Sequence, residues 1–184
     1  IIRYPLEIGM INSIANGQKN EIWVGSSDGL VRVINGPNGD YKLYRKSNSK
    51  SSIVSNYIKD LAWDQSRNML WIATDNGISR YIPSEDKFFN IQTTPYADSI
   101  VENDISELMV ATRSGRLWYT TATEPGINCL SVDFSSESNS PPPANHFEHD
   151  PIDKKSIADN NITDFIEDKA CLLYTSDAAD DSGC

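Results

Sequence analysis

Basic residues, histidines and cysteines are all scarce in this chain of 184 residues. It has 16 Lys and Arg against 26 Asp and Glu, which gives a formal net charge of −10. A chain this acidic, with no basic stripe, is a poor partner for nucleic acid or for an anionic membrane surface. The same acidic balance leads us to expect no direct membrane contact by this segment.

The scarcity of histidine also limits the chemistry that we expect. The only two, His146 and His149, lie in a proline-flanked loop rather than on a helix that would direct both toward a metal. No order of Ser, His and Asp predicts nucleophilic catalysis, and no spacing singles out a catalytic pair among the many carboxylates. We therefore expect no metal, no cofactor and no catalytic residue in this segment.

A repeated pattern dominates the sequence. The motif Ser-Ile-x-x-Asn-x-Ile-x-x-Leu occurs three times, with Phe in place of Leu in the last copy, starting at Ser52, Ser99 and Ser156. Trp71 and Trp118 follow the first two copies and are 47 residues apart, and Trp23 lies in an earlier Ile-Trp-Val-Gly. The third copy has extra residues, which fall in a Ser- and Pro-rich run over 135–144. A period of this length predicts a repeat architecture for the whole chain.

Each repeat has room for four short strands and for no helix of ordinary length. In the second repeat the apolar segments are 58–63, 69–74, 78–82 and 88–92, and Asp75-Asn76-Gly77 is typical of a tight hairpin turn. The first repeat has matching segments at 11–15, 21–25, 30–34 and 41–45. Four-stranded repeats of roughly 40 to 50 residues indicate the blades of a β-propeller. We predict an all-β propeller fragment of about three antiparallel blades and the start of a fourth.

The second repeat also resembles a known family. Leu-Trp-Ile-Ala-Thr at 70–74, Gly-Ile-Ser-Arg-Tyr at 77–81 and the preceding 52–64 are similar to the two-component regulator propeller repeat. The resemblance covers about 10–170, and the third copy lacks the Arg-Tyr pair. It implies a periplasmic ligand-sensing part of a hybrid two-component receptor that starts a phosphorelay. Many such receptors of Gram-negative bacteria detect oligosaccharides and would act as homodimers.

The repeats divide the chain into blades at 1–50, 51–98 and 99–155, with the start of the next blade at 156–170. Residues 171–184 resemble a translated sequencing adaptor, so we interpret this tail as non-native and leave it out of the fold prediction. With Cys171 and Cys184 in the tail, Cys129 stands alone, so no disulfide framework is expected. The chain begins without Met or a leader, and we interpret it as a fragment. Because a closed ring needs about four blades or more, we expect exposed sheet faces that further blades would cover.

Blade topology places two sets of loops on one rim. Antiparallel strands put the loop before the first strand and the turn between the second and third strands at the same edge. Both sets are rich in Asn, Asp, Ser and Thr, which hydrogen-bond sugar hydroxyls but also cap turns. The recurring Asn56, Asn103 and Asn160 fit a structural role in every blade. Side chains that differ between blades are the candidate ligand-binding residues: Tyr57, Asp75, Asn76, Asp104, Glu124 and Asn161.

Other conspicuous side chains are better explained by packing. The three repeated tryptophans should fill the space between blades, and the repeated Arg32 and Arg80 should hold a blade through hydrogen bonds. Trp63 breaks the repeat and is freer for function. Two alternatives to the sensor hypothesis stay open: a propeller that hydrolyses or cleaves glycans, and an intracellular propeller that serves as a protein-interaction scaffold.

Overall fold

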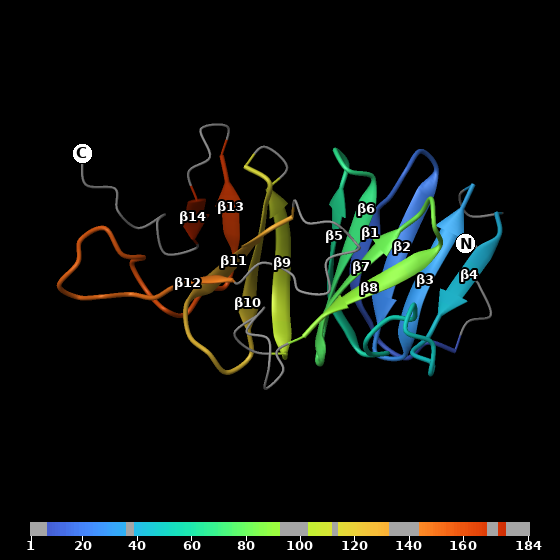
Figure 1. Ribbon diagram of the computed structural model, residues 1–184, viewed down its shortest axis with the longest axis horizontal. Coiled ribbons are helices and arrows are strands. Elements are labelled where there is room, and N and C mark those ends of the chain that lie inside the picture. Colours follow the sequence, from blue (N-terminus) through green and yellow to red (C-terminus); the bar gives the residue numbers. More distant parts are fainter. Residues whose placement is uncertain are drawn as a thin grey trace.

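The computed structural model describes residues 7–35, 39–92, 103–111, 114–132, 144–168 and 173–175. Within these residues every regular element is a β-strand. The strands form three four-stranded antiparallel sheets and one two-stranded sheet. Figure 1 shows the sheets standing side by side in chain order along the long axis of the molecule. The predicted all-β propeller fragment is confirmed.

The first sheet pairs its strands in chain order, and so do the second and third. The first consists of β1 (Ile11–Asn16), β2 (Glu21–Ser26), β3 (Gly29–Ile34) and β4 (Tyr41–Tyr44). The second consists of β5 (Ile58–Asp64), β6 (Met69–Thr74), β7 (Gly77–Ile82) and β8 (Lys87–Ile91). The third consists of β9 (Ile105–Ala111), β10 (Arg116–Thr121), β11 (Ile127–Ser131) and β12 (Asn145–Phe147). The strands predicted in the first two repeats agree with these bounds to within about two residues.

A two-stranded sheet follows the third one. It pairs β13 (Phe165–Glu167) with β14 (Leu173–Thr175). Strand β14 falls within 171–184, the tail that the sequence led us to interpret as non-native. Leu173 lies against the buried cluster that contains Trp118 and Phe165.

The sheets stack face to face through apolar clusters, each containing one repeated tryptophan. Trp23 packs with side chains of the second sheet, Trp71 with side chains of the third, and Trp118 with Phe165 of the fourth. All three are buried, with exposures of 0%, 0% and 4%. The predicted role of these tryptophans between blades is confirmed, and their large rings supply much of the buried apolar area.

The first strands of neighbouring sheets lie next to each other, β1 beside β5 and β5 beside β9. Two hydrogen bonds cross from β1 to β5. Asn12 Nδ2 donates to the Ile58 carbonyl at 2.7 Å, and Ser13 Oγ donates to Asp60 Oδ1 at 2.8 Å. The first strand of each sheet is therefore the innermost one, as in a propeller, where inner strands surround the central axis.

Large apolar side chains are exposed at the two ends of the stack. Met10, Ile11, Ile14, Ile22 and Tyr41 are exposed on or beside the first sheet, and Phe147, Ile152, Ile166 and Tyr174 near the last two sheets. The second sheet, which has a neighbour on each face, exposes only Tyr57 of its leading loop among the large apolar side chains described. The predicted exposure of sheet faces is confirmed.

Candidate functional site

One hydrogen bond recurs between consecutive blades and fixes the candidate rim. The glycine N–H at the middle turn of each sheet donates to an asparagine carbonyl in the loop that leads into the next sheet. The pairs are Gly29 to Asn56 at 2.8 Å, Gly77 to Asn103 at 2.6 Å and Gly126 to Asn160 at 2.9 Å. We call these contacts the rim braces. They confirm that middle turns and leading loops share one rim, as the sequence predicted.

The asparagine side chains stabilise the leading loops. Asn56 Oδ1 accepts the Lys46 N–H at 2.6 Å, and Asn160 Oδ1 accepts the His149 N–H at 2.6 Å. Each bond ties the loop to a segment about ten residues upstream. The structural interpretation of these recurring asparagines is therefore confirmed for both residues.

The middle turns need glycine and a hydroxyl. Gly29, Gly77 and Gly126 have φ of 127°, 113° and 85°, a range that side-chain-bearing residues rarely adopt. In the first two turns a hydroxyl closes the loop by donating to the glycine carbonyl, Ser26 at 2.8 Å and Thr74 at 2.7 Å. These polar groups are occupied by the fold itself.

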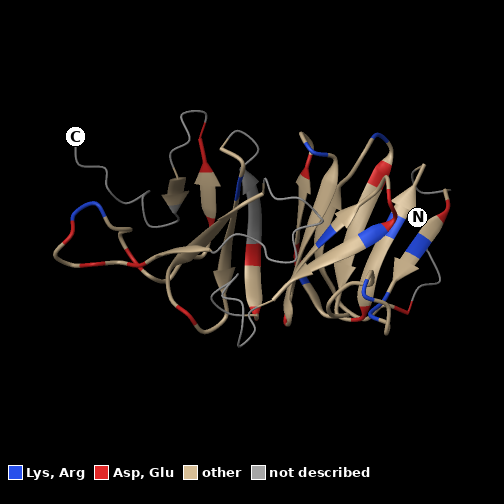
Figure 2. Cartoon of the chain, in the orientation of Figure 1, with Lys and Arg blue, Asp and Glu red and all other residues tan. Residues whose placement is uncertain are grey.

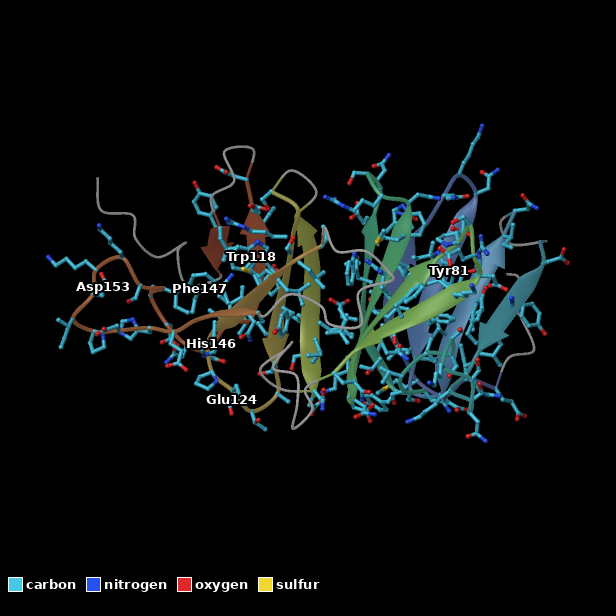
Figure 3. The ribbon with its side chains drawn as sticks, viewed as in Figure 1. Tyr81, Trp118, Glu124, His146, Phe147 and Asp153 are labelled. Atoms are coloured by element: carbon cyan, nitrogen blue, oxygen red, sulfur yellow. The ribbon has the colours of Figure 1, made fainter. Side chains whose placement is uncertain are left out.

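A pocket of about 570 Å³ opens on this rim between the third sheet and the loop leading into the fourth. Its wall combines the middle turn β10–β11, the inner strand β9 and the leading loop. The residues that line it are Ser106, Glu107, Thr120, Thr121, Ala122, Thr123, Glu124, Pro125, Gly126, Asp159, Asn160, Asn161 and Ile162. Figure 3 shows Glu124 on the turn at the lower edge of the third sheet. The pocket has the size of a small-ligand site and a mostly polar wall.

Between the first and second sheets, the position that corresponds to this pocket is filled. There a side-chain Cβ on Gly25 would lie 2.6 Å from Ile58 Cγ2, so Ile58 fills the space. Ile58 and Ile105 are fully buried, each at the start of its inner strand. In the fourth sheet the equivalent Ile162 is only half-buried and β13 starts three residues later, which leaves room for the pocket.

The pocket is acidic. Glu107, Glu124 and Asp159 line it, and within the described chain no Lys, Arg or His does. Glu107 lies on inner strand β9, where burial, together with the charges of Asp60 and Asp164, raises the pKa of its carboxyl above the ordinary value. Figure 2 shows a red segment on β9, while blue segments mark strands of the first two sheets and the start of β10.

Two of the six predicted ligand-binding residues line this pocket. Glu124 and Asn161 come from the turn and from the leading loop respectively, and both are exposed. Asp104 lies nearby, because its carbonyl accepts the Ala122 N–H at 2.9 Å. Its carboxylate forms an ion pair with Lys59.

The other three predicted residues occupy the same rim at the second sheet, away from the pocket wall. Asp75 is exposed in the middle turn, and Tyr57 is 38% exposed in the leading loop. The backbone of Asn76 is bound by the fold, since its N–H donates to Thr74 Oγ1 at 3.1 Å and its carbonyl accepts Gln92 Nε2 at 2.8 Å.

Sequence reasoning missed Glu107, Thr120 and Asp159. Thr120 pairs with Glu107 across the β9–β10 ladder, so both side chains share one face. The repeat offset gave a usable signal for Glu107. It occupies the position of Ser13 and Asp60 in the earlier repeats, and this position on the inner strand varies in charge.

The repeated arginines serve the fold. Arg32 lies over the Trp23 ring at 5.3 Å and forms an ion pair with Glu21, while its Nη1 donates to Tyr81 OH at 3.2 Å. Burial opposes the charge of Arg32, but the hydrogen bond and the charge of Glu21 keep its pKa above the ordinary value. Arg80 lies over Trp71 at 5.7 Å.

The third sheet keeps this cation–ring contact with a different residue. Cys129 stands opposite Trp118, at the place of the repeated arginine. Arg116, two residues before the tryptophan on the same strand, lies 5.8 Å from the Trp118 ring centroid instead. Trp63, which the sequence left freer for function, packs partly buried against the cluster around Trp23.

The two histidines bind separate partners. The ring nitrogens of His146 lie 2.7 Å from Asn128 Oδ1 and 2.7 Å from Glu148 Oε1. His149 Nδ1 lies 2.8 Å from the Ile157 carbonyl. In the part of the chain that the structure describes, no group of three or more His, Cys, Asp or Glu could hold a metal ion, and no helix could span a membrane.

Solved structures share this fold. The extracellular domain of BT3049 from B. thetaiotaomicron, described as a hybrid two-component system, superposes with a TM-score of 0.70 at 20% identity. The corresponding domain of BT4673 from the same organism gives 0.67 at 21% identity. The matches cover 94% and 91% of this chain, but only 23% and 22% of the two neighbours. This chain therefore spans less than a quarter of such a domain.

A more distant likeness involves an enzyme. Virginiamycin B lyase from Staphylococcus aureus gives a TM-score of 0.53 at 16% identity, over 73% of this chain and 42% of the lyase. Identities this low establish the fold alone. The fold is a β-propeller. No protein-family model and no curated protein matches the chain, and none of the comparisons supports an adaptor origin for residues 171–184.

Proposed function

We propose that this chain is part of the extracytoplasmic ligand-sensing propeller of a hybrid two-component receptor, and that its rim binds an oligosaccharide without catalysing a reaction. The observation that carries the proposal is the polar rim pocket, held in place by the rim braces, on a fold shared with extracellular domains of such systems. The repeat motifs around Trp71 support the same assignment. In a Gram-negative cell the propeller would lie in the periplasm.

The pocket wall suits a sugar. Asn161 supplies an exposed amide, and Glu124 supplies an exposed carboxylate that can accept a hydrogen bond from a sugar hydroxyl. Thr121 is already engaged, since its hydroxyl donates to the Glu124 carbonyl at 3.1 Å. These groups stand on loops supported by a rigid stack of sheets, the usual arrangement for binding residues.

Signalling would follow from differential affinity. A ligand that spans the turn of one blade and the leading loop of the next favours one relative arrangement of the two, and this bias can pass to the rest of a receptor dimer. The kinase and the phosphorelay would belong to the whole protein, of which this chain is one segment.

The test is a panel of oligosaccharides released from polysaccharides, screened by thermal shift and confirmed by calorimetry. We expect one class to bind, and Glu124→Ala and Asn161→Ala to weaken it at least fivefold. Gln65→Ala, an exposed side chain in the β5–β6 turn on the opposite rim, is the matched control. If no oligosaccharide binds, or if the control weakens binding as much as the rim variants do, the proposal is wrong.

The same panel addresses the enzyme alternative. Bound oligosaccharides are incubated with the chain and analysed by mass spectrometry for cleaved or unsaturated products. Turnover would replace the sensing proposal with a hydrolase or lyase. The complete gene gives an independent check, because a sensor requires an export signal, a membrane helix and a kinase in the same reading frame.

A further inference from the structure

The wall of the rim pocket contains a side-chain hydroxyl that forms no hydrogen bond with the described part of the chain. Thr120 is only 6% exposed, yet its hydroxyl makes no hydrogen bond within the described part of the chain, and it lines the pocket. The hydroxyl is therefore reached from the pocket, where a bound ligand can supply the hydrogen bond that the described part of the fold does not.

The fold itself does not require a polar residue at this position. Gly25 and Ala73 occupy the equivalent position in the first and second sheets, two residues after the repeated tryptophan. At Gly25 the neighbouring Ile58 fills the gap, whereas Thr120 lines the open pocket. Its hydroxyl is therefore a feature of the pocket and not of the repeat.

The charge around Thr120 is of one sign. Glu107 stands directly across the ladder from it, and Glu124 and Asp159 complete the wall. Burial raises the pKa of the Glu107 carboxyl, and the charges of Asp60 on β5 and of Asp164, just before β13, add to this effect. Lys59, a cation of the second inner strand, forms an ion pair with Asp104. No described cation of the wall compensates the carboxylates.

We propose, resting on the sensing function above, that the rim pocket selects an amine-bearing oligosaccharide of the glucosamine type and rejects acidic ones. The ligand ammonium group lies against Glu107, and a neighbouring ligand hydroxyl or ammonium proton donates to Thr120 Oγ1. A negatively charged sugar entering the same pocket meets three carboxylates of like charge, and the described wall offers no cation to pair with it.

Calorimetry with three tetrasaccharides tests this selectivity. Glucosamine tetramer carries amines, N-acetylglucosamine tetramer has the same backbone with the charge removed, and galacturonate tetramer is acidic. At 50 mM salt we expect the amine form to bind at least tenfold more tightly than the acetylated form, and galacturonate not to bind. Raising the salt to 500 mM should reduce the tenfold preference, because the attraction is electrostatic.

Two variants separate the charge from the hydroxyl. Glu107→Gln should remove most of the preference for the amine form while leaving the acetylated form within about twofold. Thr120→Val should weaken both forms by a similar factor. Glu124→Gln, on an exposed turn, gives a second charge variant with little effect on folding. Asp40→Asn, an exposed residue just before β4 and away from the pocket, is the matched control.

The outcomes distinguish this inference from the sensing function. Equal or tighter binding of the acetylated or acidic tetramer, lost on Asn161→Ala, would refute the charge selectivity while the rim still binds sugar. An unchanged preference in Glu107→Gln would also refute it. If none of the three tetramers binds, the selectivity for amine-bearing sugars is wrong, and the wider oligosaccharide panel decides the sensing function separately.

Discussion

Replacing Gly77 by alanine perturbs the rim brace between the second sheet and the loop leading into the third. Gly77 has φ of 113°, and a Cβ placed there would lie 2.5 Å from the Ile91 carbonyl oxygen. The neighbour is backbone, so it cannot rotate away. The Gly77 N–H also donates to the Asn103 carbonyl at 2.6 Å, which anchors the loop leading into the third sheet.

The expected cost follows from these contacts. Left-handed backbone costs an L-residue about 1–2 kcal/mol, and overpacking against a fixed atom adds about 1–3 kcal/mol. The lower entropy of the unfolded alanine chain offsets about 0.4–1 kcal/mol. We expect a net loss of about 2–4 kcal/mol in the free energy of unfolding, a large part of the stability of about 5–15 kcal/mol that is usual for a domain.

Urea unfolding followed by tryptophan fluorescence measures this loss. The midpoint should fall with an unchanged slope, because the same surface is exposed on unfolding. Ser84→Ala, an exposed residue in the turn between β7 and β8, is the control and should change stability by less than about 0.5 kcal/mol. A Gly77→Ala variant as stable as this control would refute the assignment of the glycine to a strained brace.

Three further predictions follow. Because burial raises the pKa of Glu107, the folded state binds the carboxyl proton more tightly than the unfolded state, and stability falls as the pH rises past the ordinary carboxyl range. The Glu107→Gln variant should therefore have a higher melting temperature than the parent at pH 7 and the same one near pH 4. A lower melting temperature of the variant at pH 7 would contradict the raised pKa. Trp71→Ala should cost about 3–5 kcal/mol in the free energy of unfolding, and Trp63→Ala, partly exposed, about 1–2 kcal/mol; equal losses in urea titrations would show that the two rings are packed alike. The apolar side chains exposed at the first sheet should make the chain self-associate in sedimentation experiments, and the double variant Ile14→Lys with Ile22→Lys should reduce this; a monomeric parent with a sharp melting transition would argue against it.

The repeat and its strands could be predicted because they depend on short-range patterns. Alternation, turn glycines and a fixed offset between tryptophans recur in each copy, and each copy is one four-stranded sheet. The shared rim was also predictable, since antiparallel strands alone determine which loops lie at the same edge. The recurring asparagines could be assigned to the fold for the same reason.

The last strand, β14, could not be predicted from these repeat patterns. Leu173–Thr175 lacks the tryptophan motif of the earlier blades, yet it pairs with β13 because Leu173 reaches the apolar cluster around Trp118. Packing against a neighbouring sheet compensates for the missing motif.

By itself, the sequence determined the propeller repeat, the burial of its tryptophans and the rim on which Glu124 and Asn161 lie. Only the tertiary structure decided that these two share one pocket with Glu107 and Thr120, while Tyr57 and Asp75 lie apart from it. The physical reason is that a pocket is a gap between neighbouring blades. Its presence depends on whether an isoleucine of the next blade fills the space, as Ile58 does, and this contact forms only when the sheets stack.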